Sequence, residues 1–335
     1  MTPAPDDILE LAHDWLAAGR GVALATVVRT WGSSPRPAGS QMAVDAGGSF
    51  AGSVSGGCIE AAVIEEALAS IGDGRARLLD FGVSDEAAWE VGLACGGRVQ
   101  VLVERLKADA LFDRLLTLRA SRRPAALVSR LADGVQALVE ADRVTGALAL
   151  SADEFAQARA RLVSGQSGVL EDGQSFVRVH APAPRLLIVG AAHIAQFLAP
   201  MASMAGFAVT LIDPRRAFLQ EARFPGIALS GEWPDEAMAR LAPDAGSAVV
   251  TLTHDPKLDD PALAAALASP AFYIGALGSE RTHAKRLARL AEQGLAGETQ
   301  RIHAPVGLKL GGRQPGEIAV AILAQIIAVR HRSAG

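Results

Sequence analysis

The stretch that decides the fold reads Leu186-Leu187-Ile188-Val189-Gly190-Ala191-Ala192-His193-Ile194-Ala195: an apolar strand runs directly into a glycine turn and a helix start. Asp213 stands 23 residues after Gly190, at the end of the next apolar run. In a dinucleotide-binding turn, N–H groups at a helix start meet a pyrophosphate, and an acidic side chain binds a ribose hydroxyl. Ala192 replaces a glycine that lets the backbone approach the pyrophosphate, so the pattern favours the fold more than it favours a bound dinucleotide.

From residue 186 onward, apolar strands alternate with helical segments. We expect strands at 186–189, 207–212, 248–252 and 272–274, and helices from the Gly190 turn to 205, near 235–241, near 261–268 and at 281–293. This alternation predicts a parallel sheet with helices on both faces. The fold class is therefore α/β, with a C-terminal Rossmann-like doubly wound parallel sheet.

The N-terminal half has shorter strands and fewer helices. Periodicity predicts helices at 6–18, 59–71 and 109–121, and strands at 22–30, 41–46, 49–55, 75–81, 98–106, 125–131 and 135–140. The two prolines at Pro182 and Pro184 are typical of an extended connector. We expect a smaller N-terminal α+β domain at 1–179, a linker at 180–185 and the Rossmann-like domain at 186–335.

Composition excludes several classes of protein. With 335 residues, of which 50% are hydrophobic and 20% charged, the chain can bury a large core. A net charge of −4 and 4% aromatic residues disfavour nucleic-acid binding. The longest apolar stretch, 318–329, contains Gln325 and is shorter than the roughly 20 residues that span a bilayer. With no signal-like start, we expect a cytoplasmic protein without membrane contact.

Cys58 lies in a glycine-rich loop before a predicted helix, after Gly56 and Gly57. The N–H groups and dipole of a helix start favour a thiolate or an anionic ligand there. The second cysteine, Cys95, precedes Gly96 and Gly97 just before a strand, where backbone can approach a ligand closely. The alternative is that both cysteines are small buried apolar residues. Two cysteines are too few for a disulfide framework or a cysteine-only metal site.

Three further loops carry polar candidates. The segment 30–40 contains Ser33, Ser34 and Arg36, which suit a phosphate or a polar heterocycle, although a plain connector would look the same. In the C-terminal half, two loops follow predicted strands, and their candidate ligand residues are His254, Asp255, Ser279 and Arg281. An ordinary serine N-cap explains Ser279 equally well, and a simple turn explains the Asp213-Pro214-Arg215 segment.

Together these loops make the chain similar to the XdhC/CoxI family of accessory proteins, almost end to end. The motifs that carry the resemblance are Gly32-Ser33-Ser34-Pro35-Arg36, Gly52 to Glu60, Cys95-Gly96-Gly97, Gly190 to Ala195, Leu252 to Asp259, Tyr273 to Arg281 and His303 to Leu308. The sequence departs from the family pattern at Ala192, where glycine is typical, and at Glu280, where a basic residue is expected.

The resemblance implies a chaperone that binds the molybdenum cofactor (molybdopterin) and inserts it into apo xanthine dehydrogenase or a related molybdenum hydroxylase. It also implies contact with a cysteine desulfurase that supplies sulfur to molybdenum, and a homodimer. Cys58 and Cys95 would contact the metal; the cofactor itself would meet the glycine loops and the candidates Ser33, Ser34, Arg36, Gly190, His193, Asp213, His254, Asp255, Ser279 and Arg281. Such a cofactor needs N–H-rich loops, polar edges and a soft thiolate.

Two other hypotheses stay open. An NAD(P)-dependent oxidoreductase would place Asp213 on the ribose and use His193 or His254 as a proton donor, and its weak point is Ala192. A regulatory or scaffolding partner would bind the dehydrogenase but not its cofactor. The sequence favours an accessory protein over a catalyst.

Overall fold

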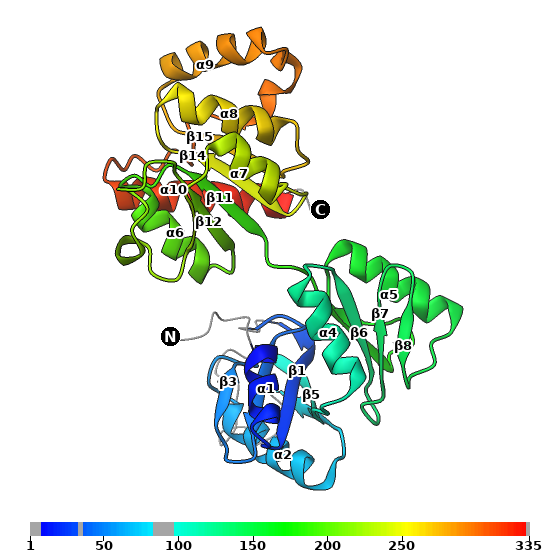
Figure 1. Cartoon of the computed structure of the whole chain (residues 1–335). Helices are drawn as coiled ribbons and strands as arrows, with labels where there is room; N and C mark the ends of the chain where they lie inside the picture. The colour runs from blue at the N-terminus through cyan, green and yellow to red at the C-terminus, as the bar shows by residue number, and fades with distance from the viewer. Residues whose placement is uncertain (1–7, 33–35, 83–96, 333–335) are drawn as a thin grey trace. The chain divides into compact units, whose positions relative to one another are not determined.

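The computed structural model describes residues 8–32, 36–82 and 97–332. The chain divides into two compact units, residues 1–182 and 183–335, which we call the N-terminal and C-terminal units (Figure 1). The division falls inside the connector expected at 180–185. Among the described helices, none is both long and apolar enough to cross a bilayer.

The N-terminal unit begins with an antiparallel five-stranded sheet in the order β3-β2-β1-β5-β4. Its strands are β1 (Val22–Trp31), β2 (Gln41–Asp45), β3 (Phe50–Gly52), β4 (Arg77–Phe81) and β5 (Arg98–Arg105). Helix α2 (Glu60–Asp73) packs on one face through Val63 and Ala67. The opposite face is covered by α1 (Ile8–Ala17) and α4 (Ala110–Ala120).

A second antiparallel sheet completes this unit, in the order β8-β7-β6-β10-β9. Its strands are β6 (Ala125–Arg130), β7 (Gln136–Val139), β8 (Val144–Gly146), β9 (Gly168–Val169) and β10 (Ser175–His180), with α5 (Ala152–Ser164) packed against it. The sequence prediction lacked β8, β9, β10 and α5. Helix α5 carries Phe155, Ala158 and Leu162 at helical spacing on the side that packs on this sheet. Ser151 and Glu154 form a capping box at its start.

Helix α4 joins the two sheets of the N-terminal unit. Its residues Phe112, Leu115 and Leu118 lie in one core with Leu24 of β1 and Leu138 of β7. The helix starts where Asp109 accepts hydrogen bonds from the amides of Leu111 and Phe112, at 3.1 and 3.0 Å. The layer between the sheets is therefore built from segments far apart in the sequence.

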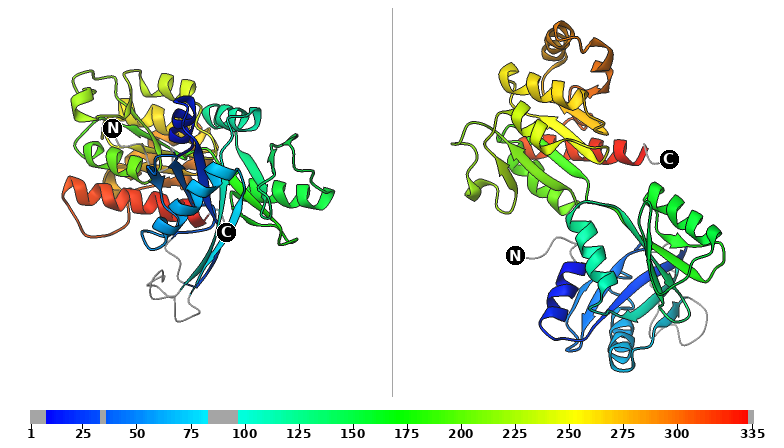
Figure 2. Two further views of the ribbon diagram at one scale, coloured as in Figure 1. Left: turned by 90° about the horizontal axis from the view of Figure 1, so that it is seen from below. Right: turned by 45° about the vertical axis from the view of Figure 1, so that its right-hand side comes forward.

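The C-terminal unit is a six-stranded parallel sheet in the order β13-β12-β11-β14-β15-β16, which is the strand order of dinucleotide-binding folds. Its strands are β11 (Arg185–Val189), β12 (Ala208–Ile212), β13 (Ala228–Ser230), β14 (Ser247–Thr251), β15 (Tyr273–Ala276) and β16 (Ile302–His303). Helices α6 (Ala195–Met204) and α10 (Pro315–Arg332) pack on one face, and α7 (Pro234–Leu241), α8 (Pro256–Leu267) and α9 (Glu280–Glu292) on the other (Figure 2). The predicted fold class is confirmed.

Two helices of this unit differ from the prediction. Helix α8 begins at Pro256, five residues earlier than expected, because Asp255 caps it and proline is tolerated at a first helical position. The apolar stretch around Gln325 is the long helix α10. Its Gln325 Oε1 accepts hydrogen bonds from the Tyr273 hydroxyl at 2.6 Å and the Gly307 amide at 2.8 Å, which fixes the helix against β15.

Candidate functional site

Four loops of the C-terminal unit lie at the carboxyl edge of its parallel sheet, after β11, β12, β14 and β15. Between them they carry the predicted residues Gly190, His193, Asp213, His254, Asp255, Ser279 and Arg281. Open parallel sheets bind ligands outside the carboxyl ends of their strands, where the strand order reverses. Strands β11 and β14 are neighbours at that reversal. The fold therefore gathers these residues at the edge where ligands of such sheets bind.

Position 190 requires glycine because the loop after β14 lies directly against its backbone. Its φ of +109° lies in a region that favours glycine, and a Cβ there would lie 2.5 Å from Thr253 Cγ2. His193 is exposed in the turn before α6, and its ring centroid lies 6.3 Å from that of Phe197. Gly190 thus serves the packing of two loops, whereas His193 faces solvent.

Asp213 is fully buried, and its own chain already occupies both of its carboxylate oxygens. Oδ2 accepts from the Ala191 amide at 2.9 Å and from Arg215 Nη2 at 2.7 Å, while Oδ1 accepts from Arg215 N and Nε at 3.0 and 2.8 Å. Burial acts to raise the pKa of Asp213, but these hydrogen bonds hold it below its usual value. A ribose hydroxyl would have to compete with the guanidinium of Arg215, so the dinucleotide role of Asp213 stays a prediction.

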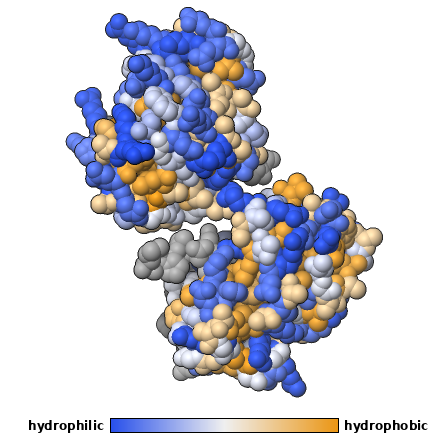
Figure 3. All heavy atoms as spheres, viewed as in Figure 1, coloured by the Kyte–Doolittle hydropathy of each residue, from blue (hydrophilic) through white to orange (hydrophobic). Residues whose placement is uncertain are grey.

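A basic pocket of about 300 Å³ lies beside these loops, and we define it by the side chains that line it. They are His254, Pro256, Asp259, Arg281, Thr282, Lys285, Arg286 and Arg289. Four of them are cations at spacings of four, five and eight residues along α9, so they share one side of that helix. Figure 3 shows hydrophilic residues gathered over α9. The pocket is suited to an anion.

Arg286 is the buried cation of the basic pocket, with 2% of its side chain exposed. Its Nη2 donates to the Leu277 carbonyl at 2.9 Å and lies 3.5 Å from Asp259 Oδ2. Within the described residues, its Nε and Nη1 have no hydrogen-bond partner. Burial raises the pKa of Asp259, against hydrogen bonds from Thr253. Because an unpaired buried donor is costly, the two free guanidinium nitrogens point to an anionic ligand.

Three predicted residues at this edge have local structural roles. Asp255 caps α8 by accepting from the Lys257 amide at 3.0 Å. Ser279 caps α9 by accepting from the Thr282 amide at 3.2 Å, which is the alternative role that the sequence left open. His254 has a φ of +64°, an uncommon conformation for a residue with a side chain. Its strained backbone turns the chain between β14 and α8 and leaves the imidazole in the basic pocket.

In the N-terminal unit, the glycine loop before α2 is organised by Glu60. The Gly56 and Gly57 amides donate to its two carboxylate oxygens at 3.1 and 2.8 Å, and Ser53 Oγ donates at 2.8 Å. Burial acts to raise the pKa of Glu60, but hydrogen bonds from Ser55 and Ser53 lower it to about 2. These glycine amides, predicted to bind the cofactor, are therefore already used within the loop.

Cys58 stands exposed at the end of that loop as a free thiol. Its amide donates to Ser55 Oγ at 3.0 Å, so its backbone is held while its side chain faces solvent. Arg36 reaches the same loop, with Nε donating to the Ser53 carbonyl at 3.3 Å. The fold thus brings the predicted Arg36 and Cys58 segments together.

The other predicted residues of this unit are only partly described. Ser33, Ser34, Cys95 and Gly96 lie outside the described residues. Gly97 is buried, and the pairing of Trp31 with Arg98 places it next to the end of β1. Within residues 8–32, 36–82 and 97–332, no three metal-binding side chains of His, Cys, Asp or Glu lie together. Metal contact by Cys58 and Cys95 stays a prediction.

Sequence reasoning missed the inner half of the basic pocket. Lys285, Arg286 and Arg289 follow Arg281 at helical spacing within a segment that was predicted to be a helix. A basic stripe running four and eight residues on from Arg281 was the available signal. The burial of Arg286 could not be predicted from the sequence, because it depends on the packing of α8 against α9.

Comparisons with known proteins agree with the fold of both units. Residues 15–82 match the model of the XdhC and CoxI family, and residues 186–326 match the XdhC Rossmann domain. The chain is 32% identical to the molybdenum cofactor insertion chaperone PaoD of Escherichia coli, over 96% of this chain and 88% of that protein.

Two further matches cover most of the chain. It is 29% identical to a probable xanthine dehydrogenase subunit of Bacillus subtilis, over 93% of this chain and 94% of that protein. A solved structure from Bacillus halodurans, described as a xanthine dehydrogenase, has the same fold: its TM-score is 0.81 at 23% identity, covering 97% of this chain and 96% of that one. The chain belongs to the XdhC and CoxI family.

Proposed function

We propose that this chain is a molybdenum cofactor insertion chaperone for xanthine dehydrogenase or a related molybdenum hydroxylase. The observation that carries the proposal is the basic pocket, in which buried Arg286 keeps two guanidinium nitrogens without a partner among the described residues. The relationship to PaoD also supports the proposal, since PaoD is named a molybdenum cofactor insertion chaperone and is matched over 88% of its length. The cofactor is cargo that the chain binds and releases.

The phosphate of molybdopterin is the part of the cargo that suits the basic pocket. Arg281 and Lys285 are exposed at the pocket, and Arg286 lies beneath. A guanidinium with two free N–H positions matches the oxygens of a phosphate better than those of a neutral ligand. Arg289 is held by Asp260, with Nη2 donating to Oδ1 at 2.9 Å, so it contributes charge rather than a free donor.

Cys58 is the proposed contact for molybdenum. A thiolate is a soft ligand that suits such a metal, and the exposed position of Cys58 after the Glu60-held loop leaves its sulfur accessible. Cys95 is proposed for the same role from its glycine context alone. The chain would present the cofactor to a cysteine desulfurase for sulfuration and then to the apo-enzyme, acting in the cytoplasm as a homodimer.

The test is to measure molybdenum by elemental analysis and pterin by fluorescence after oxidation, in protein purified anaerobically from cells that make the cofactor. The variant Arg281→Met/Lys285→Met is expected to retain at least tenfold less of both, with an unchanged melting temperature, because both side chains are exposed. Arg240→Met is the matched control, because Arg240 is an exposed cation of the same unit paired with Glu232 outside the pocket.

The thiols are tested in the same preparations. Cys58→Ala is expected to lose molybdenum without unfolding, and Ser164→Ala, another exposed small residue of the N-terminal unit, is expected to lose none. Folded wild-type protein that carries neither metal nor pterin beside an active cofactor pathway overturns the proposal. Equal cofactor content in wild-type and Arg281→Met/Lys285→Met protein would show that the basic pocket does not bind the cofactor.

A further inference from the structure

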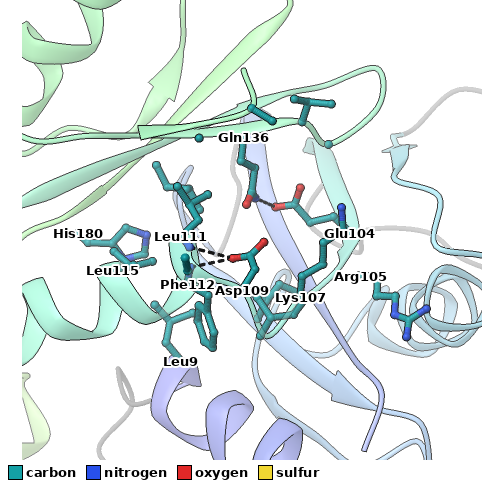
Figure 4. Close-up of a pocket in the computed structure, with 18 of the residues that line it drawn as sticks. Leu9, Glu104, Arg105, Lys107, Asp109, Leu111, Phe112, Leu115, Gln136 and His180 are labelled. Carbon is teal, nitrogen blue, oxygen red and sulfur yellow. Dashed lines mark hydrogen bonds between the residues drawn. The ribbon is translucent and has the colours of Figure 1, made fainter. Parts of the chain in front are cut away.

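A second cavity, of about 360 Å³, lies in the N-terminal unit, in the layer between its two sheets (Figure 4). Its lining residues come from α1 and α4, from strands of both sheets, including β1, β5, β7 and β10, and from the loops that follow β5, β6 and β8. The apolar part of its wall consists of Leu9, Leu24, Leu106, Leu111, Phe112, Leu115 and Leu127. Its volume falls in the range of small-molecule sites, which are roughly 300–1,000 Å³.

The cavity is separate from the residues considered for the cofactor. Helix α2, which follows Cys58, packs on the face of the first sheet that carries Ala23 and Val27. Leu24, which lines the cavity, belongs to the opposite face, together with α1 and α4. Side chains of adjacent strand positions point to opposite faces of a sheet. The cavity and the Cys58 loop are therefore on different sides of that sheet.

Two side chains in the wall have buried hydrogen-bonding atoms that lack partners among the described residues. His180, at the end of β10, is 3% exposed, and neither ring nitrogen has a partner among the described residues. Glu104, in β5, receives a hydrogen bond from Gln136 Nε2 to Oε1 at 2.7 Å, but its buried Oε2 has no partner there. A buried polar group that stays unpaired destabilises the folded protein. Two of them around one cavity indicate that something polar fills it.

The charge state of these groups restricts the ligand. Burial raises the pKa of Glu104 to about 7, against the hydrogen bonds from Gln136 and Ser129 and the charge of Lys107. Burial also holds the pKa of His180 well below its usual value, together with the positive charges of Arg178 and Arg119. The imidazole is therefore neutral, with one N–H donor and one acceptor nitrogen. A charged ligand would gain no counter-ion from His180.

We propose that this cavity is a ligand site for an uncharged aromatic amide or lactam. Its ring would lie against Phe112 and the leucines, its N–H would donate to Glu104 Oε2, and a polar group at its far side would pair with His180. Figure 4 shows His180 on one side of the cavity and Glu104 with Gln136 on the other, so one molecule with two polar ends can serve both. The amide is favoured because it supplies a donor and an acceptor without charge.

Benzamide is the probe, titrated into the full-length protein at pH 7 and followed by calorimetry and by the melting temperature. We expect saturable millimolar binding to one site and a rise in melting temperature. Benzoate, which has the same ring and a negative charge, is expected to bind at least tenfold more weakly, because Glu104 is part-ionised at this pH. Glu104→Gln is expected to weaken benzamide binding at least fivefold. His180→Leu is expected to weaken binding of 4-hydroxybenzamide, whose hydroxyl lies at the far side of the ring, at least fivefold, and to affect benzamide less.

Two controls keep the outcome interpretable. Glu171→Gln changes an exposed carboxylate of the same unit outside the cavity and is expected to bind benzamide normally. Arg281→Met/Lys285→Met protein is also expected to bind it normally, so failure of the cofactor proposal leaves this result unaffected. No binding of benzamide at 20 mM to folded protein, or equal binding by wild-type and Glu104→Gln protein, overturns the proposal and leaves ordered water as the occupant.

Discussion

At the scale of single residues, some hydrogen-bond donors in the candidate loops already have partners within the chain, whereas others have none among the described residues. The N–H groups of Gly56 and Gly57 look like a phosphate cradle in the sequence, but the carboxylate of Glu60 takes their hydrogen bonds. In the basic pocket the reverse holds, because Arg286 is buried with two nitrogens free of partners in the described chain. Free donors, more than glycine content, favour the basic pocket as the proposed anion site.

The first prediction concerns Glu60. Glu60→Gln places an NH₂ group against amide donors that the carboxylate accepted from, so we expect the free energy of unfolding to fall by about 2 kcal/mol. Urea unfolding at pH 7 measures it. Glu65→Gln, an exposed change in the same helix, is expected to stay within about 0.5 kcal/mol of wild type.

The lowered pKa of Glu60 predicts how the stability difference between wild-type and Glu60→Gln protein changes with pH. Glu60 has a pKa of about 2 when folded and 4.5 as a free side chain. The unfolded state therefore binds more protons between these values, and the contribution of Glu60 is present above about pH 4.5 and lost as the pH falls toward 2. The stability gap between wild type and Glu60→Gln should narrow from pH 6 to pH 3. A gap that is constant over this range contradicts the assignment.

At the scale of elements, the helix starts of the C-terminal unit decide how its ligand edge is built. Helices α8 and α9 begin at capping side chains, Asp255 and Ser279, directly after the loops that contribute to the basic pocket. The caps fix where α9 begins and therefore which of its side chains meet α8. The buried ion pair of Arg286 with Asp259 forms across that contact.

The second prediction separates the capping oxygen of Asp255 from its negative charge. Asp255→Ala is expected to cost about 1 kcal/mol of unfolding free energy, because the Lys257 amide loses its acceptor. Asp255→Asn keeps an acceptor and is expected to cost only a few tenths. Chemical denaturation compares the three proteins. If Asn and Ala cost the same, the charge of Asp255 matters more than its capping oxygen.

At the scale of the whole molecule, the chain consists of two units that each carry their own cores. Among the described residues, those of the Rossmann-like sheet cluster with helices of the C-terminal unit, and those of the two antiparallel sheets cluster with residues of the N-terminal unit. Both units have the length of ordinary independent domains, about 50–250 residues. Each holds one of the two pockets proposed as ligand sites.

The third prediction is that residues 1–182 and 183–335 fold separately. Each segment, expressed alone, should show a cooperative thermal transition by circular dichroism, because its hydrophobic clusters are complete within it. Pyrophosphate should raise the melting temperature of 183–335 and leave that of 1–182 unchanged, as the basic pocket lies wholly in the former. A segment that stays unfolded alone would show that it depends on the other.

Much of the fold was predictable because its signals are local. The alternation of apolar strands and helices beyond residue 186 depends on neighbours within one element, and it predicted the parallel sheet and the turn at Gly190. Helix α5 and strand β10 were missed although their signals are local as well. Phe155, Ala158 and Leu162 recur at helical spacing, and Val177 and Val179 alternate along the strand. The role of Glu60 in holding the glycine loop could have been predicted, since its hydrogen-bond partners lie within seven residues of it.

By itself the sequence determined the fold of the C-terminal unit, the helix start beside Cys58 and the connector near Pro182. These features depend on short-range periodicity, glycine and proline, which act within a few residues. Only the tertiary structure decided which polar atoms are buried without partners in the described chain, among them atoms of Arg286, Glu104 and His180. That outcome depends on segments as distant as those of Leu9 and His180 meeting in one layer, where water is excluded and every missing hydrogen bond becomes a cost.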